Sequence, residues 1–173
     1  NPEILFDASI LEKGANIVKE VNKEVAAIIK INPAARTTCV KPSGNASVLL
    51  QTASGIHAEH SPMYIRNVQM NKESEITQAI IKQNPYMVEE SVWSSTGTDV
   101  VVSFPILPKK GSMYKDDLLG IKHLELVKKA QKHWVETGTN EELCADKGIR
   151  HNVSNTIIVD DWDDVEKYVY ENR

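Results

Sequence analysis

The chain has 173 residues, of which 41% are hydrophobic and 25% are charged, and its formal net charge is −4. This composition suits a folded domain with a real core and excludes a disordered tail. Because the sequence has no dense basic cluster, it also disfavours a protein that grips the nucleic-acid backbone, although one nucleotide pocket would need only a few donors.

The two cysteines, Cys39 and Cys144, are far apart and form no C-x-x-C pair. They predict neither a disulfide framework nor a zinc site, and we expect reduced thiols in a cytoplasmic protein. No apolar run approaches the roughly 18 residues of a membrane span, and no signal peptide is visible. Because the chain opens at Asn1 without an initiator methionine, we expect a fragment or an excised domain.

The first third of the chain predicts a long helix, a short strand and a short helix. Apolar residues recur with helical period over residues 9–31, and a proline follows closely. Residues 36–41 are Thr-rich and apolar, which is typical of a strand. After a break, residues 46–52 predict one or two turns of helix. Residues 63–70 predict the next strand.

The rest of the chain continues the same alternation. A helix is expected over residues 73–83, and the β-branched run at 99–106 predicts the clearest strand. A second long helix is expected over 116–136. Residues 151–159 predict a strand, and residues 163–172 predict a helix with acidic residues in its first turn, as the helix dipole favours.

Strands that alternate with helices indicate an α/β organisation with crossover connections. Since no repeat, low-complexity segment or linker interrupts the chain, we expect one domain over residues 1–173. Trp134 and Trp162 are expected to close the edges of its core. The acidic residues at 160–164 are expected to cap the last helix and to be solvated.

A strand, a tight turn and a helix start succeed one another around Ser43, Gly44, Asn45 and Ser47. A helix start offers unpaired backbone N–H groups to an anion, and Gly44 allows a ligand to approach the backbone. Ser and Asn side chains can add donors. The pattern therefore predicts a phosphate site without a metal, but an ordinary capped helix explains the same residues, because this is not a Walker loop.

Other residues with chemical potential carry little signal. Cys39 lies in the expected strand, where an inert core thiol is the simplest interpretation, and nothing near Cys144 would activate it. All five histidines are interpreted as surface residues: His57, His60, His123, His133 and His151. No nucleophile–base order, paired carboxylates or metal-ligand spacing is visible.

Four segments in order resemble the large subunit of ribonucleotide reductases. Residues 37–47 resemble the family strand that runs into Pro-Ser/Thr-Gly and a short helix. Residues 54–57 are similar to the Ser-Gly-Ile-Glu segment, and residues 64–66 to a Tyr-x-Arg-Arg strand. Residues 151–157 resemble a barrel strand near the end of the catalytic domain. The sequences of these segments are closer to the adenosylcobalamin-dependent (class II) branch of the family than to the branch with a separate radical subunit.

The resemblance implies that the chain is the C-terminal part of a ten-stranded α/β barrel. In the family, the loop after the matching strand holds the substrate phosphates through backbone N–H groups and hydroxyls. By this match, the phosphate-binding residues are Ser43, Gly44, Asn45, Ala46 and Ser47. The match implies adenosylcobalamin for the complete enzyme, bound mainly by residues elsewhere.

The implied parent reaction is radical reduction of a ribonucleoside di- or triphosphate to a deoxyribonucleotide for DNA synthesis. The implied partners are that substrate, the remainder of the reductase chain and a thioredoxin-like reductant, with no nucleic acid and no membrane. The Asn-Pro-Cys-x-Glu finger loop with the radical cysteine is absent from this sequence, so no catalytic or metal-binding residue is assigned. Asn45 stands where Thr is frequent, and His57 where Glu is frequent.

Two other functions remain open. The chain could be a non-catalytic α/β module that binds a phosphate or nucleotide, or a structural half of a split enzyme. An incomplete barrel would expose strand edges and associate with other chains. A phosphotransferase is disfavoured because no metal-binding carboxylates accompany the loop.

Overall fold

The computed structural model describes residues 2–172, without the side chains of Pro2 and Asn45. The chain divides into two compact units, which are described separately below. The larger unit contains the segments up to Glu59 and from Lys109 onward, and the smaller unit is His60–Pro108. The assignment of residues 1–173 to a single domain stays a prediction.

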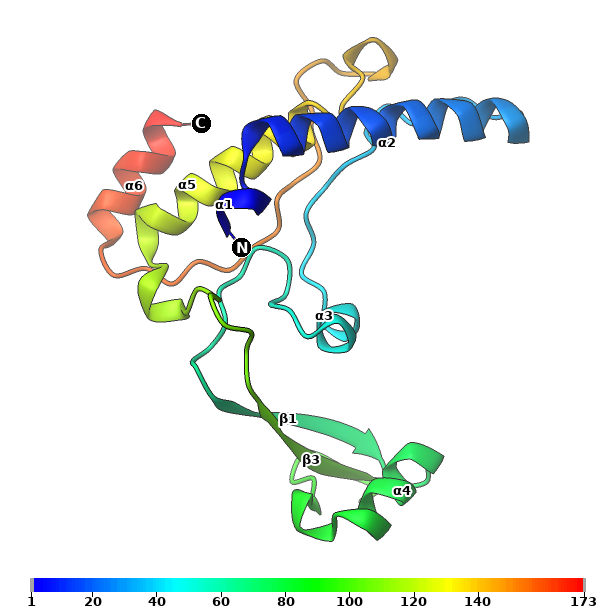
Figure 1. Cartoon of the computed structure of the whole chain (residues 1–173), viewed down its shortest axis with the longest axis vertical. Coiled ribbons are helices and arrows are strands. Elements are labelled where there is room, and N and C mark those ends of the chain that lie inside the picture. Colours follow the sequence, from blue (N-terminus) through cyan, green and yellow to red (C-terminus); the bar gives the residue numbers. More distant parts are fainter. Residues whose placement is uncertain (1, 173) are drawn as a thin grey trace. The chain divides into compact units, whose positions relative to one another are not determined.

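The larger unit is mainly helical (Figure 1). Its helices are α1 (Pro2–Leu5), α2 (Ala8–Ile29), α3 (Asn45–Leu50), α5 (Gly120–Ala130) and α6 (Trp162–Glu171). A π-helix, η3 (Gln131–Glu136), continues α5, and two short 3₁₀ turns are η2 (Lys115–Asp117) and η4 (Glu141–Leu143). The helices predicted over 9–31, 46–52 and 163–172 are confirmed.

Local caps explain where these helices begin. The Asp7 carboxylate accepts a hydrogen bond from the Ile10 N–H at 3.0 Å and starts α2. The Asp161 carboxylate accepts from the N–H groups of Asp163 and Asp164 and starts α6, which confirms the expected capping role of the acidic residues. The long helix predicted over 116–136 is shorter at its start and changes to π geometry after Ala130.

The strands predicted over 36–41 and 151–159 are wrong. Both segments are extended, but they form only isolated bridges, Val40 with Val153 in parallel and Arg36 with Thr139 antiparallel. Several hydrogen bonds of the first segment go to the irregular stretch at the end of η3. The hydroxyl of Thr38 donates to the carbonyl of Trp134 at 2.7 Å, for example. A helix end beside an extended segment cannot supply the regular ladder that a strand needs.

The smaller unit is a three-stranded antiparallel sheet with one helix. Its elements are β1 (Tyr64–Asn71), α4 (Glu75–Gln83), the 3₁₀ turn η1 (Pro85–Met87), β2 (Val88–Glu90) and β3 (Asp99–Ile106). The strand order is β1-β3-β2, with Val68 opposite Val102. The strands predicted over 63–70 and 99–106 and the helix over 73–83 are confirmed.

Two features of this sheet differ from expectation. Strand β2 was not predicted, because a three-residue edge strand leaves too short a pattern. The expected crossover connections are wrong for this sheet, since they join parallel strands and all pairings here are antiparallel. The architecture is therefore a mixture of helices and sheet, in agreement with the α/β class in its coarse sense.

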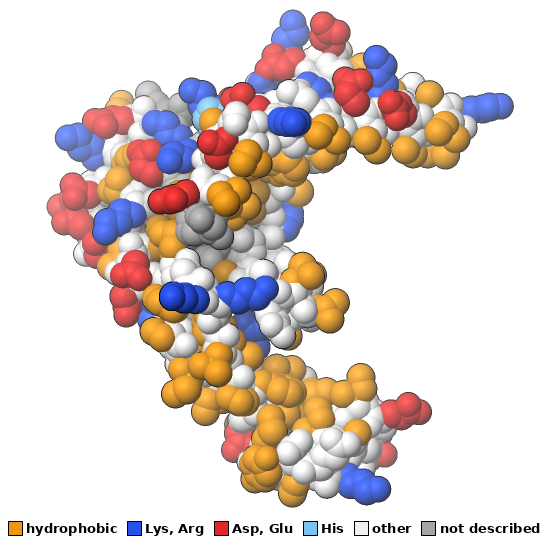
Figure 2. Space-filling view, in the orientation of Figure 1, with side chains coloured by type: hydrophobic (Ala, Val, Ile, Leu, Met, Phe, Trp, Pro, Cys, Tyr) orange, Lys and Arg blue, Asp and Glu red, His pale blue; other side chains and the backbone are white. Residues whose placement is uncertain are grey.

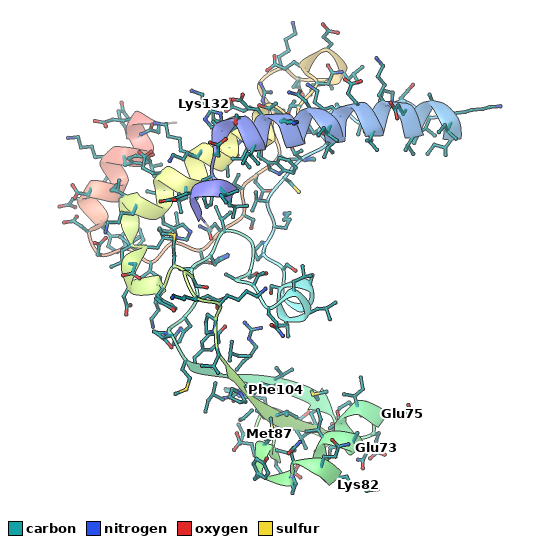
Figure 3. The ribbon with its side chains drawn as sticks, in the orientation of Figure 1. Glu73, Glu75, Lys82, Met87, Phe104 and Lys132 are labelled. Atoms are coloured by element: carbon teal, nitrogen blue, oxygen red, sulfur yellow. The ribbon has the colours of Figure 1, made fainter. Side chains whose placement is uncertain are left out.

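Each unit has a small core of its own. Val100, Val102 and Thr77 are buried in the sheet unit. Figure 3 labels Met87 and Phe104 in the same unit, and Glu75 and Lys82 on its helix α4. The buried apolar residues of the helical unit are Ala15, Ala26, Leu118, Ala130 and Val135.

Helix α2 also carries large apolar side chains on its surface (Figure 2). Ile17, Val21, Val25 and Ile28 are between 46% and 76% exposed. Within the described residues, no helix is long and apolar enough to cross a membrane.

Candidate phosphate-binding loop

The five predicted phosphate-binding residues lie at the start of α3. Gly44 precedes the helix with ordinary right-handed backbone angles, φ −71° and ψ −63°, and no side chain caps the helix start. Gly44 and Ala46 are exposed, whereas the side chain of Asn45 lies outside the described residues. The first N–H groups of a helix have no intrahelical partner, and such groups can bind an anion.

Ser43 and Ser47 use their polar groups within the loop. The N–H of Ser43 donates to the hydroxyl oxygen of Ser54 at 2.7 Å. The hydroxyl of Ser47 is buried and donates to the carbonyl of Ser43 and, at 3.1 Å, to that of Gly44. In this arrangement both serines fix the shape of the turn, whereas Gly44 and Ala46 are exposed.

The segment before the loop is tied to the end of the long helix. The N–H and the hydroxyl of Thr37 both donate to the carbonyl of Gly138, at 3.0 and 2.8 Å. The indole N–H of Trp134 donates to the carbonyl of Cys39 at 3.1 Å. These bonds replace the expected strand ladder and carry the chain into the loop in a fixed position.

The segment after α3 returns to the base of the loop. Gly55 has a positive φ of 60°, and a Cβ there would lie 3.1 Å from the carbonyl oxygen of Lys41. A glycine is therefore needed both for the backbone conformation and for the close approach. This turn places Ser54 beside Ser43.

Two histidines behind the loop were not identified as a site from the sequence. His123 on α5 is only 3% exposed, so its interpretation as a surface residue is wrong. Its Nε2 lies 3.0 Å from the carbonyl oxygen of Ile56 and 2.7 Å from the amide of Asn155. The His57 ring meets the His123 ring edge to face, with centroids 6.3 Å apart.

Burial lowers the pKa of His123 below its ordinary value of 6.5, and the neighbouring His57 lowers it further, while the bond to the Ile56 carbonyl opposes both effects. A signal for this burial exists in the sequence. Gly120, His123, Val127 and Ala130 recur at helical spacing and share one face of α5, which is the face that the structure buries.

The remaining candidates stay apart from the loop's polar contacts. Cys39 is exposed, so the expectation of a buried core thiol is wrong, and Cys144 is half-buried with its thiol 3.5 Å from the Asn140 carbonyl. Trp162 is 74% exposed and does not close a core edge. His133 bonds Glu12 at 2.7 Å. Over residues 2–172, no three His, Cys, Asp or Glu side chains are grouped to hold a metal ion.

Comparison with solved structures places this arrangement in a known fold. The structure is similar to a crystal structure of a B12-dependent (class II) ribonucleotide reductase, with a TM-score of 0.60 over 95% of this chain and 26% of that chain. Their sequences are 13% identical, so this match concerns the fold alone. No family model matches the chain.

Comparison with known sequences agrees with the comparison of structures. The chain is 29% identical over 131 residues to a probable adenosylcobalamin-dependent ribonucleoside-triphosphate reductase of Dictyostelium discoideum. It is 25% identical over 136 residues to an adenosylcobalamin-dependent ribonucleoside-triphosphate reductase of Euglena gracilis. These matches cover 76% and 79% of the chain but only 16% and 18% of the two relatives. The resemblance to class II ribonucleotide reductases is confirmed.

Proposed function

We propose that the chain is part of a class II ribonucleotide reductase, an oxidoreductase that reduces ribonucleotides to deoxyribonucleotides by radical chemistry in the cytoplasm. The observation that carries this proposal is the similarity to two reductases across three quarters of the chain. Within that enzyme, the chain contributes the C-terminal part of the ten-stranded barrel. The exposed apolar face of α2 supports a role as one part of a larger fold.

In this proposal, the share of the chain in the reaction is to hold the substrate phosphates. Residues 43–47 receive a ribonucleoside di- or triphosphate at the exposed backbone of Gly44 and Ala46. Hydrogen bonds from N–H groups to a charged phosphate contribute about 1.5–3 kcal/mol each. Binding of the phosphates orients the ribose toward the radical cysteine, which the remainder of the reductase would supply. A thioredoxin-like reductant would return the enzyme to its reduced form after each turnover.

Adenosylcobalamin would supply the radical that starts the reaction. The cleft along residues 51–59 has a volume of about 500 Å³, which is ordinary for a small ligand. A corrinoid is far larger than a drug-sized molecule, so this cleft would not hold it by itself. We therefore derive no step through the cofactor from this chain.

Replacement of Gly44 by valine tests the phosphate loop. A Cβ at Gly44 would meet nothing within 4 Å, and its φ is ordinary, so the variant should fold normally. In the complete reductase, Gly44→Val should raise the KM for a ribonucleoside triphosphate about tenfold or more, because it obstructs N–H contacts with the phosphate. Ala145→Val adds similar bulk at an exposed loop position and should have no effect.

Binding of the unphosphorylated nucleoside is the second control, and Gly44→Val should leave it unchanged. An unchanged KM for the triphosphate in Gly44→Val would refute the loop assignment. Formation of deoxyribonucleotide by the complete protein separates the reductase from a binding module, which would hold nucleotide without turning it over.

A further inference from the structure

The phosphate loop is supported by a second turn, residues 54–57, which contacts it through a hydrogen bond between Ser43 and Ser54. The hydroxyl oxygen of Ser54 accepts the N–H of Ser43 at 2.7 Å and so fixes the first residue of the loop. Whatever holds Ser54 in place therefore also holds the loop. The inference below rests on the proposed function, because it concerns how that loop is kept in its binding form.

His57 holds Ser54 directly. Its Nε2 accepts the N–H of Thr156 at 3.0 Å, so the proton of the neutral ring lies on Nδ1. That Nδ1–H donates to the carbonyl of Ser54 at 2.7 Å, and the backbone N–H of His57 donates to the same carbonyl at 3.1 Å. One imidazole thus joins the Ser54 turn to the segment around Thr156.

His123 holds the same turn two residues later, at Ile56. Its Nε2–H donates to the carbonyl of Ile56 at 3.0 Å, and the amide of Asn155 contacts the same nitrogen at 2.7 Å. The carbonyl oxygen of this amide has no partner among the described residues, and a half-turn of the amide brings it onto Nε2–H. His123 thereby anchors residues 54–57 to α5.

The turn has little close packing on its other side. A cleft of about 500 Å³ runs along it, with Gly55, Ile56 and His57 among its walls. Where side chains do not pack against a backbone turn, hydrogen bonds must define its position. The two imidazoles supply such bonds at the carbonyls of Ser54 and Ile56, two residues apart.

We propose that His57 and His123 are positioning residues for the phosphate loop. They clamp residues 54–57 against Thr156 and α5, so that Ser54 stays on the N–H of Ser43. They touch neither the phosphate nor the reacting atoms. Loss of the clamp releases the turn, lets Ser43 move, and weakens the grip on phosphate without changing the chemical step.

Two substitutions of His57 in the complete reductase test this proposal. His57→Ala removes both side-chain bonds and should raise the KM for a ribonucleoside triphosphate about fivefold or more, with kcat within about twofold of the wild type. Asparagine places an N–H near the position of Nδ1, so His57→Asn keeps the bond to Ser54 and should restore most of the affinity. His60→Gln, at an exposed neighbouring histidine, is the matched control and should behave as wild type.

A double-mutant cycle adds a readout that general destabilisation would not give. Ser54→Ala should raise the KM as much as His57→Ala, and the double variant should be no worse than either, because both act through one contact. Additive effects, or a fall in kcat at unchanged KM, would overturn the proposal. If His57→Ala and Ser54→Ala leave the KM unchanged while Gly44→Val raises it, the clamp fails and the proposed function stands. If Gly44→Val has no effect either, the phosphate loop itself is wrong.

Discussion

Gly138 should be the glycine in this chain that is least tolerant of a side chain. A Cβ there would lie 2.6 Å from Cγ2 and 2.7 Å from Cβ of Thr38, and closer still to the Thr38 hydroxyl. Thr38 is buried and cannot swing into solvent. Gly138→Ala must therefore push apart the two segments that the bonds from Thr37 to the Gly138 carbonyl hold together.

The structure sets the size of the effect. Overpacking of a buried contact costs about 1–3 kcal/mol, and each weakened buried hydrogen bond adds about 1 kcal/mol. We expect Gly138→Ala to lower the free energy of unfolding by about 2–4 kcal/mol. Urea titration followed by circular dichroism measures this change, and an unchanged m-value shows that both proteins unfold in the same way.

Two further variants make the test specific. Gly14→Ala is the matched control, because its Cβ would meet only Cζ3 of Trp134 at 3.3 Å and alanine favours the helix. It should change stability by less than about 1 kcal/mol. Thr38→Ala removes most of the crowding atoms, so Gly138→Ala should cost less in that background. A Gly138→Ala variant within about 0.5 kcal/mol of wild type would refute this account of the contact.

Three other outcomes follow from the structure. The pKa of His123 is lowered in the folded chain, so on acidification the unfolded chain binds this proton first. The free energy of unfolding should therefore fall as the pH drops below about 6.5. Urea titrations at several pH values should show a flatter pH dependence for His123→Gln. Burial, followed by the hydrogen bond and charge of Glu125, raises the pKa of Tyr168 to about 12, so Glu125→Gln should lower it, still above 10.0, in ultraviolet titration. Cys39→Ala with Cys144→Ala should leave turnover of the complete reductase within about twofold of wild type, because neither thiol contacts the loop, and a lost turnover in the folded variant would reveal a redox role.

Local signals were sufficient for the elements that local chemistry controls. Helix α2 has an apolar period, a capping aspartate and a following proline, and the structure confirms it almost residue for residue. Strand β3 is a run of β-branched residues, and it pairs as a central strand should. In both cases the sequence pattern and the tertiary environment favour the same backbone conformation.

Non-local contacts decided where prediction failed. Residues 36–41 have strand-like composition, but the N–H of Thr37 bonds Gly138, about a hundred positions later in the chain. The start of α5 is likewise set from a distance, because the N–H of Gly120 donates to the carbonyl of Ile158 at 2.9 Å. Secondary-structure propensity depends on a residue and its neighbours along the chain, so it cannot predict hydrogen bonds to partners that are distant in the sequence.

The candidate site also combines features with a local sequence signal and features that depend on non-local contacts. The turn at Ser43 and Gly44 has a local signature and was predicted, whereas its support comes from Ser54, His57 and His123, which no spacing rule joins to it. The helical face of α5 could have shown that His123 is buried, but not that its nitrogen meets Ile56. A buried histidine on an apolar face must find a hydrogen-bond partner, since an unsatisfied imidazole would cost about 1–3 kcal/mol. The burial alone therefore predicts a polar contact, and only the tertiary structure shows that this contact is made to Ile56, in the turn next to the candidate loop.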